Sequence, residues 1–131
     1  MDLDLFSFFQ CRDTAGYWYL ASPYSKYPDG IHAAYHEVCR CAAWLLRQGV
    51  RVYSPIAHTH PIAQYGSLDP MDHSIWLPAD RPLMQGACGL IVAQMPTWDQ
   101  SYGIGEEIKE FAAAGKPTLA LEWPRPVKVP T

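Results

Sequence analysis

The chain has 131 residues, which is enough for one domain with a single hydrophobic core. Its 49% hydrophobic content excludes a disordered chain, and its net charge of -3 argues against binding to nucleic acid polymers, which favours Lys and Arg. No apolar run reaches the roughly 18 residues of a membrane-spanning helix. The apolar start carries acids where a signal peptide would carry basic residues, so we expect a cytoplasmic protein with no membrane partner.

The first half of the chain predicts two strands around one long helix. Residues 1–16 form an extension of mixed character. Residues 17–22, rich in aromatic side chains, predict the first strand. A loop with Pro and Gly, residues 23–30, leads to a helix over residues 31–48, in which apolar residues recur at helical spacing. Residues 50–54 predict the second strand.

The second half continues the alternation. Residues 56–70 predict a long loop, and residues 71–86 predict a helix that breaks at its two prolines. The apolar residues 88–94 predict a third, buried strand. A Ser/Gly loop and a third helix then lead to a fourth strand over residues 117–121, and prolines favour an extended tail over residues 124–131.

This order of elements indicates an α/β fold with a parallel sheet covered by helices on both faces. Four strands can be recognised, and a fifth could come from either the extension or the tail. Because no repeat or domain boundary is evident, we expect residues 1–131 to form a single domain.

The most informative segment, residues 98–107, joins the third strand to the third helix, predicted over residues 108–114. Ligands of parallel α/β proteins bind at the carboxyl ends of strands and at the helix N-termini that follow. Glycines there allow backbone N–H groups to approach an anion, and Ser101 adds a hydroxyl. Glu106 and Glu107 could simply interact favourably with the helix dipole. The adjacent anion or hydroxyl site instead favours a catalytic role.

The end of the first strand predicts a second wall of the same site. In a flavodoxin-like strand order, the tips of the first and third strands flank the binding crevice. Ser22, Tyr24 and Ser25 would then face the crevice, although capping hydroxyls at a strand exit are equally typical. Asp80 precedes the third strand and is either a surface or capping carboxylate or the second acid of a glycosidic-bond-cleaving pair.

No metal site is expected. The four cysteines lack CxxC spacing. His58 and His60 would lie on one side of an extended chain, but no third ligand is evident nearby, so substrate contact or a structural role in the loop is favoured. His32 and His36 are four residues apart on a predicted helix and indicate a solvated face, because the acid is misplaced for a zinc protease motif.

Together these features resemble the nucleoside 2-deoxyribosyltransferase-like superfamily, and within it a small bacterial family of uncharacterised domains. The resemblance covers residues 17–122. It rests on residues 19–24, residues 54–56, Trp76 with Asp80, the series Ser101, Gly103, Glu107 and Ile108, and residues 115–117.

The resemblance implies a flavodoxin-like, Rossmann-like three-layer sandwich that cleaves the N-glycosidic bond of nucleosides or nucleoside 5'-monophosphates. The family's nucleophilic glutamate lies six residues after a loop serine, which here gives Glu107 and Ser101. The serine contacts the 5'-phosphate in members that hydrolyse deoxynucleoside monophosphates. Asp80 matches an aspartate near the leaving base. Members are often dimers in which a neighbour completes the site, so a homodimer or higher homo-oligomer is expected.

The resulting hypothesis is an N-ribosyl hydrolase or transferase that needs no cofactor. Glu107 attacks the anomeric carbon, and Asp80 protonates or orients the departing base. The predicted substrate-binding residues are Tyr19, Ser22, Tyr24, Asp99, Ser101, Gly103 and Gly105, with the Gly103 and Gly105 amides holding the 5' end of the sugar.

Two other classes of function remain open. Two positions and one loop differ from the family pattern. Gln94 replaces a frequent acid, Lys109 replaces a small residue, and residues 22–26 hold less Gly and Arg than the phosphate loop of the nucleotide hydrolases. Gln94 and the missing phosphate loop favour a non-catalytic nucleotide-binding or sensing module. A flavin carrier, with Trp98 stacked on the flavin, ranks last because the first loop lacks a run of Ser and Thr.

Overall fold

The computed structural model describes residues 4–12 and 15–125. In this part of the chain one sheet of parallel strands has the order β1-β5-β4-β2-β3. The strands are β1 (Asp4–Leu5), β2 (Trp18–Ala21), β3 (Val52–Tyr53), β4 (Gly89–Gln94) and β5 (Thr118–Glu122). Apart from β1, this is the order of a flavodoxin-like fold, in which the chain reverses its direction of travel across the sheet between β3 and β4.

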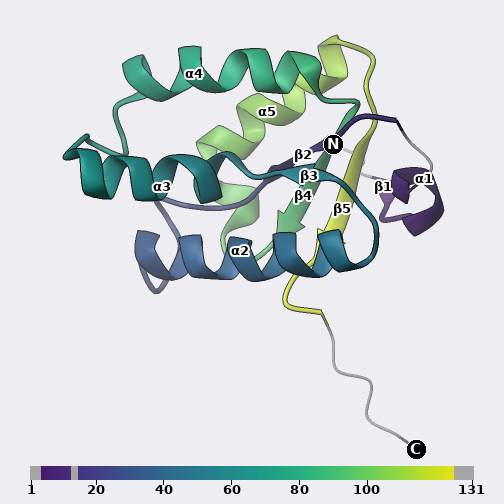
Figure 1. The fold of residues 1–131 in the computed structure, drawn as a ribbon, viewed down its shortest axis with the longest axis horizontal. Helices are drawn as coiled ribbons and strands as arrows, with labels where there is room; N and C mark the ends of the chain where they lie inside the picture. Colours follow the sequence, from purple (N-terminus) through teal and green to yellow (C-terminus); the bar gives the residue numbers. More distant parts are fainter. Residues whose placement is uncertain (1–3, 13–14, 126–131) are drawn as a thin grey trace, which may run out of the picture.

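Helices cover both faces of the sheet and complete three layers (Figure 1). The helices are α1 (Phe8–Arg12), α2 (Ile31–Arg47), α3 (Pro55–Gly66), α4 (His73–Gly86) and α5 (Tyr102–Ala113), with the short 3-10 helix η1 (Trp98–Gln100) before α5. Core residues of α1 and α2 pack on one face, and those of α4 and α5 pack on the other. The expected α/β three-layer sandwich is thus confirmed.

Alternation along β2 divides the core between the two layers. Trp18 and Leu20 pack on the face of α2, whereas Tyr19 and Ala21 pack on the face of α4 and α5. Gly89 on the neighbouring strand has to lack a side chain, because a Cβ there would lie 2.2 Å from the Trp18 ring. This packing directs Tyr19 toward the helices that carry the predicted carboxylates.

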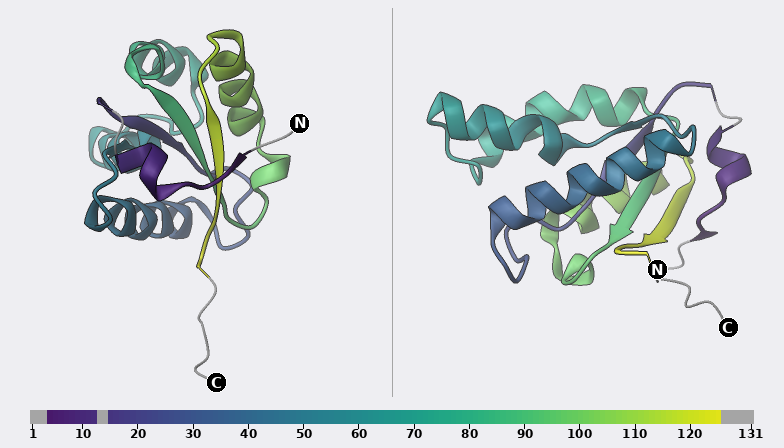
Figure 2. Two further views of the ribbon diagram at one scale, coloured as in Figure 1. Left: turned by 90° about the vertical axis from the view of Figure 1, so that its right-hand side faces the viewer. Right: turned by 60° about the horizontal axis from the view of Figure 1, so that its bottom comes forward.

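The fifth strand comes from the N-terminal extension. Asp4 and Leu5 pair with Leu119 and Ala120 of β5 and form the edge of the sheet (Figure 2). Parts of the predicted extension and of the predicted tail, residues 1–3, 13–14 and 126–131, lie outside the described residues. Within the described part of the chain, no helix is long and apolar enough to cross a membrane.

The prediction of a loop over residues 56–70 is wrong, because most of this segment forms α3. Ser54 caps this helix by accepting a hydrogen bond from the backbone N–H of Ala57, and Pro55 occupies the first helical turn, where it has no hydrogen bond to lose. The prediction interpreted Pro55 only as the end of a strand. His58 and His60 therefore lie on a helix, and the expected extended chain is also wrong.

Two further boundaries differ from the predictions. The helix α4 continues through Pro78 and Pro82 without a break. Both prolines are exposed, so the carbonyl groups that they leave without an intrahelical partner face water. The helix α5 begins at Tyr102 and not at the predicted residue 108, because Ser101 caps it by accepting a hydrogen bond from the Ile104 N–H at 3.2 Å.

Candidate functional site

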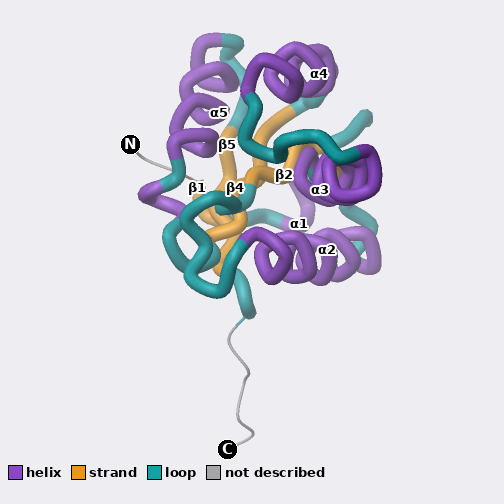
Figure 3. Tube along the Cα trace, turned by 90° about the vertical axis from the view of Figure 1, so that its left-hand side faces the viewer, coloured by secondary structure: helices purple, strands orange, loops and turns teal. Residues whose placement is uncertain are grey.

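A cavity of about 240 Å³ lies beyond the carboxyl ends of the central strands. Side chains from the loop after β2 and from α3, α4 and α5 line it, as do residues of the loop that joins α3 to α4. Figure 3 shows this loop, with the helices surrounding the strands. The location is the one that the strand order predicts for a ligand, because the loops diverge where the chain reverses direction.

Glu107 lies in this cavity, on the second turn of α5. The Tyr19 hydroxyl donates a hydrogen bond to its carboxylate. Burial raises the pKa of Glu107 to about 8; the Tyr19 hydrogen bond opposes this shift, and the negative charges of Asp80 and Glu110 add to it. Tyr19 is 1% exposed, and burial together with Glu107 raises the pKa of its hydroxyl, which stays protonated and serves as a donor.

Asp80 approaches the same cavity from α4. Burial raises its pKa to about 6, and a favourable charge interaction with His58 partly offsets the effect. Its Oδ1 atom is buried without a hydrogen-bond partner in the described part of the chain. A buried oxygen in this state is costly and indicates a place where a ligand group or water binds. Asp80 and Glu107 thus form a pair of interacting, partly desolvated carboxyl groups.

Polar groups at the end of β2 and the start of α5 form the other part of the site. Ser22 is 5% exposed and lines the cavity, and its Oγ also lacks a partner among the described residues. A Cβ on Gly103 would lie 3.9 Å from both Ser101 Oγ and Glu107 Oε1, so the Gly103 backbone runs between these side chains. The N–H groups of Tyr102 and Gly103 precede the first hydrogen bond within the helix and are available to an anion.

The structure brings together seven of the nine predicted site residues. The residues that line the cavity are Tyr19, Ser22, Tyr24, Asp80, Ser101, Gly103 and Glu107. Gly105 does not line it, and its N–H already donates to the Ser101 carbonyl oxygen at 3.1 Å, which does not favour the expected role of this amide. Asp99 lies exposed in η1 and does not line the cavity either.

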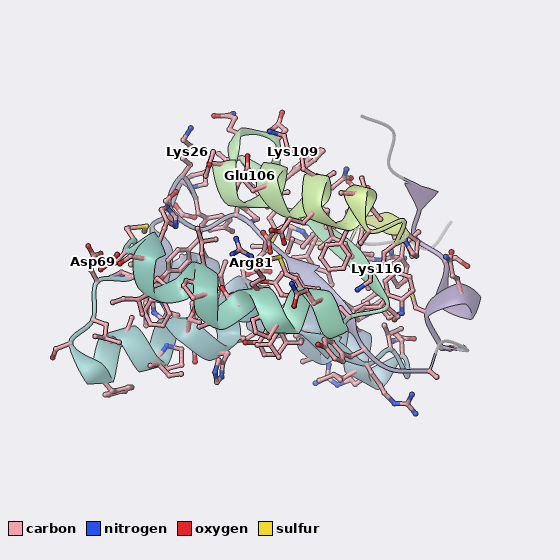
Figure 4. The ribbon with its side chains drawn as sticks, turned by 90° about the horizontal axis from the view of Figure 1, so that it is seen from above. Lys26, Asp69, Arg81, Glu106, Lys109 and Lys116 are labelled. Carbon is pink, nitrogen blue, oxygen red and sulfur yellow. The ribbon has the colours of Figure 1, made fainter. Side chains whose placement is uncertain are left out.

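The sequence analysis gave no site role to several residues that the structure places there. Arg81 brings a positive charge to the cavity and lies 3.6 Å from Glu110 across the α4–α5 interface (Figure 4). Trp76, which the resemblance paired with Asp80 without giving it a role, lies one turn before Asp80 on the same face of α4 and lines the cavity. Tyr53 does not line the cavity but lies next to it: it pairs with Tyr19 in the sheet and interacts with Asp80, and its buried hydroxyl is without a partner in the described residues.

The histidines fall into two places. His58 is exposed and interacts with Asp80 and the Tyr53 ring. His60 is 6% exposed and contacts Tyr24 and His32. Within residues 4–12 and 15–125, no three His, Cys, Asp or Glu side chains are grouped so that they could hold a metal ion.

The fold and the cavity define the class of protein: a flavodoxin-like α/β domain with a carboxylate-lined pocket at the carboxyl ends of its parallel strands. Residues 16–123 match the model of the family described as "Domain of unknown function (DUF1937)". The chain therefore belongs to this family. No curated protein matches the chain.

Proposed function

We propose that the protein is a member of the nucleoside 2-deoxyribosyltransferase-like superfamily that cleaves the N-glycosidic bond of nucleosides or nucleoside 5'-monophosphates. The observation that carries the proposal is Glu107, which is partly buried and lines the pocket, is hydrogen-bonded by Tyr19 and interacts with the second carboxyl group of Asp80. Paired carboxyl groups in different environments are the usual means of cleaving a glycosidic bond.

In this mechanism the ionised Glu107 attacks the anomeric carbon and forms a covalent glycosyl-enzyme while the C–N bond breaks. Asp80 donates a proton to the departing base or orients it. The Tyr19 hydroxyl holds the attacking carboxylate in place. Water then hydrolyses the intermediate, and a second base in place of water completes a transfer. No step requires a metal or an organic cofactor.

The 5' end of the sugar would lie at the start of α5. The N–H groups of Tyr102 and Gly103 and the hydroxyls of Ser101 and Ser22 face the cavity from adjoining segments and suit a hydroxyl or phosphate group. Trp76 offers an aromatic face in the same cavity, which suits the planar base.

The pH dependence of base release should be bell-shaped. The pKa is raised to about 6 for Asp80 and to about 8 for Glu107, so between these values the interacting pair holds one proton. The mechanism needs Glu107 ionised and Asp80 protonated. With these pKa values the proton of the singly protonated pair lies mainly on Glu107, so the productive form is a minor microstate whose share of the singly protonated pair does not change with pH. We expect kcat/KM to be highest near the middle of this range and to fall on both sides, as a pH-rate profile with a good substrate would measure. A flat profile from about pH 5 to 9 would contradict the pairing.

The direct test is base release, measured by chromatography, from a panel of ribo- and deoxyribonucleosides and their 5'-monophosphates. Release of free base supports the proposal, and comparison of each nucleoside with its monophosphate tests the role of the α5 N-terminus. Release only when an acceptor base is present indicates a transferase. Tight binding of an intact nucleotide without release under either condition would instead support the non-catalytic binding module.

We also propose that the protein forms a homodimer through an apolar surface beside the cavity. This surface consists of exposed side chains on α3, on α4, on the loop between them and at the start of α5. They are Ile62, Tyr65, Leu68, Met71, Ile75 and Tyr102. Tyr65 is 84% exposed and Tyr102 is 70% exposed, which is unfavourable for large aromatic groups left in water. Light scattering should give twice the chain mass, and Tyr65→Glu should shift the protein toward the monomer. A monomeric wild-type protein at high concentration would refute the proposal.

A further inference from the structure

A chain of hydrogen-bonding groups leads from the cavity to the outer surface of α2. Tyr24 lines the cavity, and its hydroxyl lies 2.6 Å from Nδ1 of His60 on α3. The other ring nitrogen of His60, Nε2, lies 3.4 Å from Nδ1 of His32 on α2. His60 is buried, whereas His32 is exposed. The three side chains therefore connect the cavity to solvent by a route that does not pass through the mouth of the cavity.

The surroundings of His60 keep its imidazole neutral. Burial lowers its pKa, and the nearby His32 and His36 lower it further. The Tyr35 ring stacks on His60 with centroids 4.4 Å apart, and the His36 ring lies 4.3 Å from that of His32. His58, on the same helix, interacts with Asp80 instead. A neutral imidazole has one donor and one acceptor nitrogen, as a relay between two partners requires.

We propose that Tyr24, His60 and His32 form a proton relay between the cavity and solvent. The chain has two consistent arrangements. In the first, Tyr24 O–H donates to His60 Nδ1, and His60 Nε2–H donates to His32 Nδ1. In the second, every bond is reversed: His32 Nδ1–H donates to His60 Nε2, His60 Nδ1–H donates to Tyr24, and Tyr24 O–H points into the cavity.

The second arrangement can carry one proton from solvent to the cavity, and the first can carry one proton from the cavity to solvent. Each transfer converts the relay into the other arrangement. From the second, solvent protonates the free Nε2 of His32, each proton passes to the next partner, and the Tyr24 proton goes to a group in the cavity. From the first, Tyr24 accepts a proton from the cavity, its own proton passes to His60, the His60 Nε2 proton passes to His32, and His32 releases its Nε2 proton to solvent. Both steps balance without another reactant.

Applied to the proposed function, on which this part of the inference depends, the two steps match the two halves of hydrolysis. Breaking the glycosidic bond requires a proton for the departing base, and attack of water on the glycosyl-enzyme releases one. One complete turnover would thus return the relay to its starting arrangement. Asp80 handles the proton next to the base, and the relay exchanges the net proton with solvent after the ligand closes the cavity.

The first experiment does not depend on activity. The ¹⁵N chemical shifts of the His60 ring, measured by NMR on the full chain, report which nitrogen carries the proton. In the wild type we expect one protonated nitrogen at neutral pH and a change in tautomer populations in Tyr24→Phe and in His32→Ala. His36→Ala removes a neighbouring imidazole that is not part of the chain and is the matched control. Unchanged His60 shifts in both relay variants would overturn the relay even if base release is confirmed.

The second experiment uses the substrate found by the base-release panel. We expect His32→Ala to lower kcat by about 10²-fold, at the lower end of the range typical of proton transfer, and His36→Ala to leave it unchanged. Because His32 is exposed, added imidazole should restore kcat of His32→Ala, which a merely structural role of His32 would not allow. A loss without rescue would refute the relay. Absence of base release by the wild type would refute the proposed function, and the NMR shifts would still decide the relay.

Discussion

Replacement of Glu107 by Gln is expected to reduce base release by at least roughly 10⁴-fold, the scale seen when a nucleophile is removed from an enzyme. The substitution keeps the size of the side chain, and the new amide oxygen would still accept a hydrogen bond from Tyr19, so the cavity would be preserved. It cannot form the covalent glycosyl-enzyme, because a neutral amide is a poor nucleophile. The rate of base release under saturating substrate, with wild type and variant side by side, measures the effect.

Glu106→Gln is the matched control for this experiment. Glu106 is adjacent in sequence and also borders the cavity, but its carboxylate is paired with Lys109 at 3.3 Å on the surface of α5. We expect this variant to keep most of the activity. Retained turnover in Glu107→Gln, or an equal loss in Glu106→Gln, would show that the nucleophile is misassigned.

The same Glu107→Gln substitution is expected to make the protein more stable at neutral and alkaline pH. Folding raises the pKa of Glu107 from its ordinary value of 4.5 to about 8. Its contribution to stability is therefore fully present below pH 4.5 and is lost as the pH rises through about 8. The free energy of unfolding falls by about 1.4 kcal/mol for each pH unit above the pKa of Glu107 in the unfolded chain. At neutral pH this loss is on the order of 3 kcal/mol. An amide imitates the protonated acid and removes this loss.

Urea unfolding of wild type and variant at several pH values measures this difference. The free energy of unfolding of Glu107→Gln should exceed that of the wild type at neutral pH and above, and the gap should close toward pH 4.5. Glu106→Gln should show no such gap, because its carboxylate is paired at the surface. A variant that is less stable than the wild type at about pH 8 would contradict the burial of an ionisable group at this position.

The sequence predicted the strand-to-helix junction of the site but not the residue at which α5 begins. The spacing from Ser101 to Glu107 identified the strand-to-helix junction correctly, although α5 begins earlier than predicted. That shift has a chemical consequence, because it places the Gly105 N–H inside the helix, where the Ser101 carbonyl already accepts its hydrogen bond. A cap at Ser101 was readable from the residue type, but Gly103 and Gly105, both poor helix formers, favoured a loop.

The same competition explains the missed helix α3. Pro55, Pro61 and Gly66 are residues of loops when they are read singly, whereas the Ser54 cap and the packing of α3 against α2 hold the segment in a helix. As a result, His60 is buried where an extended chain would have left it in a loop. Tertiary packing overrode the local preference, and with it changed which partners this histidine has.

The sequence by itself determined the alternation of strands and helices, the all-parallel sheet and the edge of the sheet that carries the cavity, because these follow from periodicity and from the geometry of crossover connections. Only the tertiary structure decided that Tyr19 on β2 is the hydrogen-bond donor to Glu107 and that α4 places Asp80 close to the same carboxylate. It also decided that histidines on α3 and α2 connect Tyr24 to the surface. The reason is physical: contacts between segments far apart in the chain, and the loss of water that shifts a pKa, exist only after the layers have packed.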